Sequence, residues 1–179
     1  MLTLGMPSAF IDYLAKLQVQ PELGASKRID ALEAALVKYP QIDMPVVHRF
    51  TPGLYMREIH MPAGSLCTSK IHKTEHPFVV LSGRCSVWSE GNGVEHICAP
   101  FVGITKPGSR RVLYIHEDTV WITFHVTDKT SISDIEDDII VPHYDHLGLS
   151  QDELSALRVI QHVTDKEVIS TAPEILKIS

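Results

Sequence analysis

Between Gly64 and Gly83 the chain reads GSLCTSKIHKTEHPFVVLSG. Apolar residues alternate with polar ones in two short runs, and a polar turn that carries His72 and His76 separates these runs. Because alternation with a period of two is typical of a half-buried strand, the stretch predicts a strand, a turn and a second strand that Gly83 closes. A second turn followed by a strand is indicated at 105–111, TKPGSRR. Paired units of this kind predict a small β-barrel whose interior collects side chains from distant segments.

Short strand-like runs with the same rhythm continue through the middle of the chain. Pro-Gly, Ala-Gly and Ser-Gly pairs separate them, and Gly91-Asn92-Gly93 is the clearest hairpin signal, because Gly and Asn tolerate the positive φ of a tight hairpin. Several short strands with turns at this spacing predict an all-β sandwich or barrel. The runs are 48–50, 54–61, 66–72, 78–81, 84–89, 95–99, 102–105, 111–115 and 120–127.

Helical patterns flank the barrel on both sides. Apolar residues recur every three or four positions at 7–17 and at 26–39, which predicts two amphipathic helices that a proline ends in each case. After the barrel, the acidic segment 133–138 predicts a solvated helix start or linker, and a capping-box pattern at 150–153 opens a further helix. We therefore expect one compact domain with three parts: a helical extension at 1–45, the barrel at 46–128 and a second helical extension at 129–179.

The composition is that of an ordinary globular chain and excludes several classes of function. The 179 residues carry a net charge of −6, and no run of Lys and Arg is longer than two, so nucleic acid is not an expected partner. No apolar run approaches the roughly 20 residues that cross a bilayer, and the N-terminus lacks the features of a signal peptide. The cysteines, Cys67, Cys85 and Cys98, have no CxxC spacing and predict reduced thiols. We therefore expect a cytoplasmic protein without a membrane partner.

The segment around the two histidines resembles the first motif of the cupin superfamily. In that motif a glycine precedes an H-x-H pair, a Glu follows, and a second glycine comes after six further residues. Counted back from Gly83, His76 stands at the Glu position. Lys70 and His72 stand at the two positions of the H-x-H pair.

The second cupin motif has its counterpart after the Pro107-Gly108 turn. Three residues after the glycine, where the family has a His, this chain has Arg111. The resemblance covers residues 54–125. It implies a mainly β fold, a cupin-type double-stranded β-helix barrel of two antiparallel sheets, with N- and C-terminal α-helices.

A wider set of strings is similar to cupin-like proteins of tailed bacteriophages, which have no assigned activity. These strings are SKIHKTEHPF at 69–78, PGSRRVLY at 107–114 and HEDTVW at 116–121. The resemblance implies a phage-related protein in the cytoplasm of a bacterial host cell. Because cupins commonly pair edge strands or exchange helical arms between subunits, it also implies a homodimer.

One interpretation of these residues is a metal-dependent cupin enzyme of the dioxygenase or isomerase type, with Fe, Mn, Ni or Zn as the candidate divalent ion. Such a site needs three or four nitrogen or oxygen ligands and an open position for a substrate. His72 and His76 would supply two ligands. The third would come from one of three residues: Glu75, His116 or His125. Lys70 and Arg111 cannot ligate a metal, since both carry protonated cationic groups.

The other interpretation is a basic pocket that binds an anionic metabolite without a metal. Its cationic side chains would be Lys70, His72, His76 and Arg111. A buried charge without a partner costs several kcal/mol, so such a pocket needs a negatively charged occupant. A nucleotide, a sugar phosphate or a carboxylate would meet that need, with His72 or His76 as the catalytic acid or base. Trp121 and His125 are expected to line the pocket as well.

We take the basic small-molecule pocket as the leading hypothesis and the metal-dependent enzyme as the alternative. A third hypothesis is a structural or assembly scaffold without catalysis, in which internal salt bridges fill the pocket. The first hypothesis requires no cofactor, and whether the protein is an enzyme stays open at this point.

Overall fold

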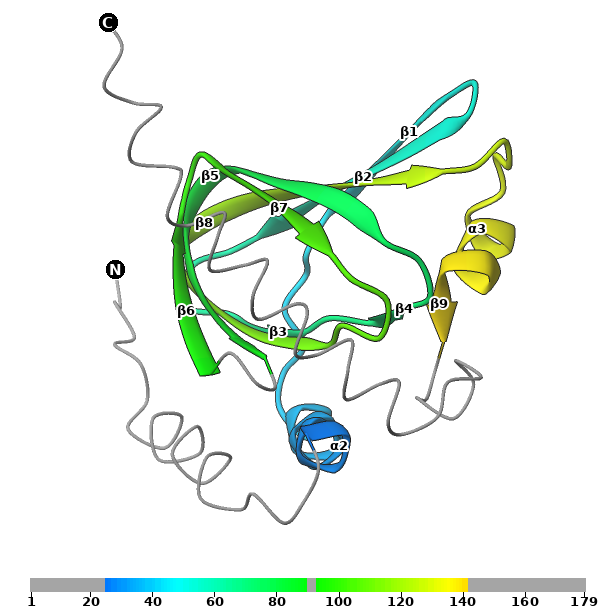
Figure 1. Ribbon diagram of the computed structural model, residues 1–179. Coiled ribbons are helices and arrows are strands. Elements are labelled where there is room, and N and C mark those ends of the chain that lie inside the picture. The colour runs from blue at the N-terminus through cyan, green and yellow to red at the C-terminus, as the bar shows by residue number, and fades with distance from the viewer. Residues whose placement is uncertain (1–24, 90–92, 142–179) are drawn as a thin grey trace, which may run out of the picture.

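The computed structural model describes residues 25–89 and 93–141, which form a strongly curved β-structure with helices at its outside (Figure 1). Every pairing between its strands is antiparallel. The predicted fold class, a mainly β barrel with flanking helices, is therefore confirmed. The helices predicted at 7–17 and from 150 onward lie outside the described residues, as does the centre of the hairpin at 90–92.

The described elements alternate between short strands and two very long ones. In chain order they are α2 (Ala25–Leu36), β1 (Val46–Thr51), β2 (Leu54–Met61), β3 (Leu66–Thr68), β4 (Ile71–His72), β5 (His76–Ser89), β6 (Gly93–Cys98), β7 (Phe101–Thr105), β8 (Arg111–Val126), α3 (Ile132–Ile139) and β9 (Ile140–Val141).

The long strands β5 and β8 lie side by side and connect the rest of the barrel. Within the described residues, seven strands form one sheet in the order β1-β2-β8-β5-β6, with β3 also paired to β8 and β7 also paired to β5. The first half of β5 pairs with β7 and its second half with β6, while β8 pairs first with β3 and then with β2. Each long strand therefore serves two sets of neighbours, which curls the sheet around a common interior.

Gly83 does not close a strand, contrary to the prediction, because β5 continues through it. Its φ of +87° suits glycine, and the register between β5 and β8 shifts on both sides of it. Before this irregularity Phe78 and Val80 are buried in the barrel core, and after it Cys85 and Val87 are. The inward-facing positions thus change from even to odd numbers at Gly83.

The turn expected between the runs 111–115 and 120–127 is also absent, because β8 runs unbroken from Arg111 to Val126. Its inward positions keep the same parity over the whole length, with Leu113, Ile115 and Trp121 all in the barrel core. The polar residues Glu117 and Asp118 lie in this part of β8, where β5 and β8 are out of register. Arg84 of β5 stands opposite Glu117. A local irregularity in a continuous strand therefore replaces the expected turn.

Helix α2 packs on the outer face of the barrel. Ile29 and Leu32 are buried against Trp88 and Val112. Arg110 is buried beneath this helix, where its Nη1 lies 2.6 Å from Asp30 Oδ1 and its Nη2 lies 2.8 Å from Glu33 Oε2. α2 ends at Leu36, earlier than the predicted 39, and the next residues are exposed and gain no burial from continuing it.

The segment predicted as a solvated helix start forms α3, which covers one end of the barrel. Ile135 and Ile139 are buried and pack against Tyr55 of β2. β9 follows directly and pairs with β4, with Ile140 opposite His72. This pairing fixes the position of His72. Among the described residues, no helix has the length and apolar character of a membrane span.

Candidate metal centre and ligand cavity

The curled sheet and α3 enclose a cavity of about 230 Å³. Its lining comes from β2, β3, β4, β5, β7, β8, α3 and β9, and from the segments between them. Most of the exposed lining surface is apolar, and the polar side chains include three histidines, two arginines and one lysine. A concave, largely apolar pocket with a few polar groups is the usual form of a small-molecule site.

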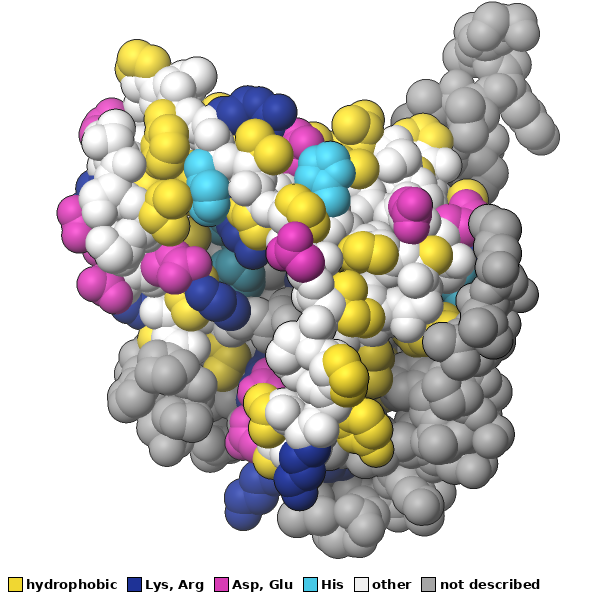
Figure 2. All heavy atoms as spheres, turned by 180° about the vertical axis from the view of Figure 1, so that it is seen from behind, with side chains coloured by type: hydrophobic (Ala, Val, Ile, Leu, Met, Phe, Trp, Pro, Cys, Tyr) yellow, Lys and Arg dark blue, Asp and Glu magenta, His cyan; other side chains and the backbone are white. Residues whose placement is uncertain are grey.

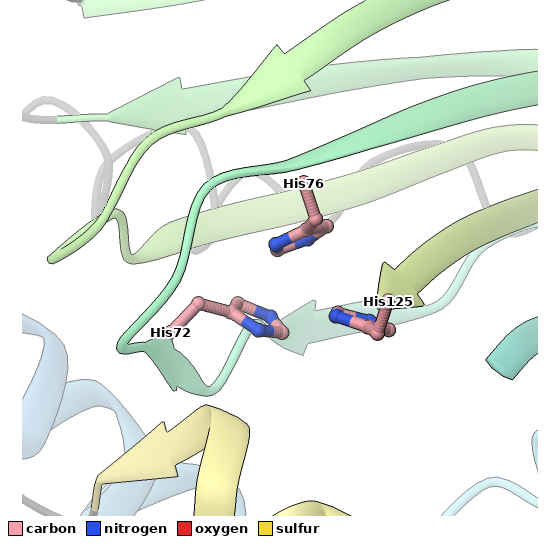
Figure 3. Close-up of side chains that lie close together, drawn as sticks. All are labelled: His72, His76 and His125. Carbon is pink, nitrogen blue, oxygen red and sulfur yellow. The ribbon is translucent and has the colours of Figure 1, made fainter. Parts of the chain in front are cut away.

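His72, His76 and His125 converge in this cavity from three separate strands (Figure 3). His72 belongs to β4, His76 is the first residue of β5, and His125 is next to the last residue of β8. The ring centroids of His72 and His76 lie 4.3 Å apart, as do those of His76 and His125. The coordinating nitrogens of all three lie within 4.8 Å of one another, so the group can hold one metal ion.

Hydrogen bonds orient two of the three rings. His76 Nδ1 lies 3.1 Å from the carbonyl oxygen of Thr74. Since a carbonyl oxygen only accepts, Nδ1 carries the proton and Nε2 keeps a free lone pair. His125 Nε2 lies 3.1 Å from Thr123 Oγ1, which leaves His125 Nδ1 for the cavity. Support of the outer ring nitrogen by a neighbouring oxygen is typical of metal-binding histidines.

Three ring nitrogens in this group are buried and lack a hydrogen-bond partner among the described residues. They are His72 Nδ1, His76 Nε2 and His125 Nδ1. A buried polar atom without a partner costs about 1–3 kcal/mol, and native structures contain few of them. Three such atoms from three strands at one point therefore indicate that a bound group belongs there.

Burial keeps the three imidazoles neutral. It lowers the pKa of His72 to about 2 and that of His125 to about 3, and each is lowered further by a neighbouring histidine, His76. Burial also lowers the pKa of His76, and the hydrogen bond to Thr74 raises it by a smaller amount. A neutral imidazole is the form that ligates a metal, so the trio is ready to coordinate at neutral pH.

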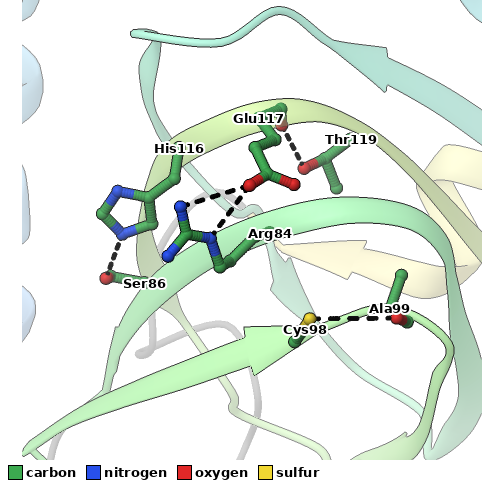
Figure 4. A network of polar contacts seen from close by, with 7 residues as sticks. All are labelled: Arg84, Ser86, Cys98, Ala99, His116, Glu117 and Thr119. Atoms are coloured by element: carbon green, nitrogen blue, oxygen red, sulfur yellow. Dashed lines mark hydrogen bonds and ion pairs between the residues drawn. The ribbon is translucent and has the colours of Figure 1, made fainter.

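The other two candidates for a third ligand lie elsewhere. Glu75 forms an ion pair with Lys106. His116 Nε2 lies 2.6 Å from Ser86 Oγ and is not part of the cavity lining (Figure 4). Of the three candidates, only His125 joins the two motif histidines.

The four basic residues that the sequence placed together all line this cavity, but at different depths. Lys70 is at the rim, where its exposed Nζ lies 2.9 Å from Glu136 Oε1. Arg111 is buried in the cavity wall, with its Nη1 3.2 Å from Thr105 Oγ1 and its guanidinium over the ring of Phe78. Trp121 also lines the cavity and stacks on Phe78.

Sequence reasoning missed Arg57, which lines the same cavity. It lies on β2, where Tyr55, Ile59 and Met61 line the cavity too. The alternation of this strand puts odd-numbered residues on one face, and that signal alone could have found Arg57.

Comparison with known proteins gives likenesses of fold. No family model and no curated protein matches the chain. An uncharacterised conserved protein with a double-stranded β-helix domain from Klebsiella pneumoniae subsp. pneumoniae is similar, with a TM-score of 0.43 and 17% identity over 52% of this chain and 85% of that one. An RmlC-like cupin family protein from Methanocaldococcus jannaschii has a TM-score of 0.39 and 7% identity over 50% and 87% of the two chains.

The cupin-2 domain of an XRE family transcriptional regulator from Enterobacter cloacae gives a TM-score of 0.40 and 15% identity over 48% of this chain and 98% of that domain. Likenesses of this size transfer no activity, substrate or partner to the chain.

Proposed function

We propose that this protein is a cupin-type metal protein in which His72, His76 and His125 hold a divalent ion at the wall of a small-molecule cavity. The observation that carries the proposal is the set of three buried ring nitrogens without a partner, one from each histidine. A bound ion would give each of these lone pairs a partner and remove the cost of leaving them unsatisfied.

The donor set narrows the choice of metal. Imidazole nitrogens suit Zn, Fe and Ni, whereas Mn prefers carboxylate and water ligands. The trio contains no carboxylate, so Zn, Fe and Ni are better candidates here than Mn. An ion with three protein ligands and an open position supplies a Lewis acid that polarises an oxygen of the ligand.

The charge of the site favours an anionic ligand, as the basic-pocket hypothesis also holds. Three neutral imidazoles would leave the charge of a divalent ion uncompensated. Arg57, which also lines the cavity, adds a further positive charge. The carboxylate of Glu136, the acidic residue of the lining, already pairs with Lys70. A negatively charged small molecule would balance this cavity.

A metal-free anion site in the same cavity is the second candidate function. The position of Arg111 in the buried wall favours it, because its guanidinium could pair with a ligand anion without any ion. Dioxygenase and isomerase activities remain alternatives within the metal-dependent function.

Metal analysis of the purified, untagged protein tests the proposal. After incubation with Zn, Ni or Fe(II) and removal of excess, the wild type is expected to hold about one ion per chain. His125→Gln is expected to hold less than about a tenth of that amount. The matched control is His96→Gln, because His96 is an exposed histidine outside the cavity. Full retention of metal by His125→Gln, or no uptake by the wild type, would overturn the proposal.

A further inference from the structure

Arg57 brings a positive charge to the edge of the histidine group. On β2 it stands opposite Thr123 of β8, whose hydroxyl contacts His125. Its charge also contributes to the lowered pKa values of His72 and His125. Strand register and cavity lining therefore agree in placing Arg57 beside the trio in the same cavity.

Arg57 differs in its partners from other arginines in the described part of the chain. Three arginines pair with carboxylates there: Arg49 with Glu58, Arg84 with Glu117, and Arg110 with Asp30 and Glu33. On the face seen in Figure 2, basic side chains are interspersed with acidic ones. No ion pair or hydrogen bond joins the Arg57 side chain to another residue within 25–89 and 93–141. A partly buried guanidinium in an apolar cavity is costly without an anion beside it.

The size of the cavity limits what that anion can be. Pockets for drug-sized ligands measure roughly 300–1,000 Å³. At about 230 Å³, this cavity is smaller. Of the ligand classes considered above, a nucleotide is drug-sized, whereas a small carboxylate fits this volume.

The hydrogen-bonding capacity of the lining also favours a carboxylate over a phosphate. The hydroxyl groups of the lining contact other described groups: Tyr55 with His48, Thr68 with Glu33, Ser69 with Arg111, Thr105 with Arg111, and Thr123 with His125. Ser69 and Thr105 accept from Arg111 and so keep a proton to donate, but two hydroxyl donors are few for the three acceptor oxygens of a phosphate. A carboxylate needs two, which the fork of one arginine supplies.

We propose that the cavity binds a small monocarboxylate with an apolar body, and that Arg57 holds its carboxylate beside the histidine trio. The apolar body packs against Met61, Leu113 and Trp121, which line the same space. The assignment rests on the proposed function, because it takes the small-molecule cavity as the site of binding. Arg57 is thus a specificity-determining residue that separates acids from their neutral analogues.

Calorimetric titration of the zinc-loaded full chain tests this assignment with benzoate and hexanoate as probes. Their neutral counterparts, benzamide and hexanamide, and inorganic phosphate are titrated in parallel. At least one of the two acids is expected to bind at least about tenfold more tightly than its amide. Phosphate is expected to bind more weakly than that acid. No binding of either acid, or tighter binding of phosphate, would overturn the assignment.

Substitution of Arg57 gives a second test of the assignment. Arg57→Met is expected to weaken binding of the acid at least about tenfold and to leave metal content unchanged. Arg49→Met is the matched control, because Arg49 lies on the neighbouring strand and pairs with Glu58 outside the cavity. Arg57→Lys keeps the charge without the fork and is expected to bind with intermediate affinity. Unchanged acid binding in Arg57→Met would contradict the proposal.

The two proposals fail separately in this experiment. If the wild type takes up no metal but still binds the acid through Arg57, the metal proposal fails and the carboxylate assignment stands. If the wild type holds its metal and Arg57→Met binds the acid as well as the wild type does, the carboxylate assignment fails alone.

Discussion

Two histidine clusters depend on the same pair of long strands, and they differ in what their ring nitrogens meet. The inner cluster, His72, His76 and His125, lies in the cavity. The outer cluster is the set Ser86, His96 and His116. The serine hydroxyl lies 2.8 Å from His96 Nδ1. It also lies 2.6 Å from His116 Nε2, as Figure 4 shows. A hydroxyl can donate to one imidazole and accept from the other, so these contacts are satisfied without a ligand.

Strand geometry explains why one cluster faces inward and the other does not. β5 carries His76 before Gly83 and Ser86 after it, and the inward face changes parity at that glycine. β8 keeps its parity, so His125 faces the cavity with Trp121, while His116 lies on the opposite face. Histidine content alone would not distinguish the clusters. Burial combined with partnerless nitrogens does.

The largest expected effect on stability comes from a substitution at Gly83, where the inward face of β5 changes parity between the two clusters. In Gly83→Ala the new Cβ would overlap the carbonyl oxygen of Asp118, at a φ of +87°. We expect a loss of about 3 kcal/mol or more in the free energy of unfolding, from the backbone strain and the overlap together. Gly53→Ala has a similar φ of +76° but open space around its Cβ, so about 1 kcal/mol is expected. Urea denaturation measures both, and equal losses would argue against the role of Gly83.

The next largest effect is on the pH dependence of stability, to which the inner histidines should contribute more than the outer ones. In the metal-free protein the pKa values of His72 and His125 lie at about 2 and about 3, below the ordinary 6.5. The unfolded chain therefore binds more protons between about pH 6.5 and pH 3, and stability falls as the pH falls through that window. The loss is up to about 1.4 kcal/mol per pH unit for each histidine.

Denaturation in EDTA between pH 7 and pH 5 checks this dependence. His72→Gln should flatten the slope, whereas His116→Gln should leave most of it, because burial affects the His116 imidazole much less than that of His72. A wild-type stability that is constant over this range would show that the inner histidines are not buried as neutral groups.

The smallest expected effect is in the outer cluster. Ser86→Ala removes the hydroxyl between His96 and His116, but both rings lie close enough to the surface for water to replace it. We expect a loss of about 1 kcal/mol or less in stability and no change in metal content. Thermal denaturation and metal analysis of the same sample check both. A loss of metal in this variant would mean that the two clusters are coupled.

Local signals in the sequence were sufficient for the turns and for most strands. Gly53, Gly64 and Gly108, each predicted to lie in a turn, have the positive φ that a glycine turn allows. Gly83 has the same conformation within a strand. A turn and an irregularity look alike locally, and the partner strand β8 decides between them.

The site was predictable where a motif marked it and unpredictable where it depended on long-range pairing. His72 and His76 stood out by their spacing, and His125 was one of three open candidates. Regular alternation through 66–72 would put Lys70 on the same face as His72, but β3 ends at Thr68 and β4 begins at Ile71, so the alternation is interrupted at Lys70. Arg57 lies outside any motif, and only its parity on β2 connects it to the cavity.

X-ray absorption of the zinc-loaded protein is the most direct test of the central claim that the inner cluster is a metal centre. The expected spectrum shows three imidazole nitrogens at about 2.0–2.1 Å and no sulfur. Burial raises the pKa of Cys67 to about 12 and that of Cys85 to about 11, so these thiols remain protonated and are poor ligands. Sulfur scattering at about 2.3 Å, or a first shell with fewer than three imidazoles, would contradict the claim.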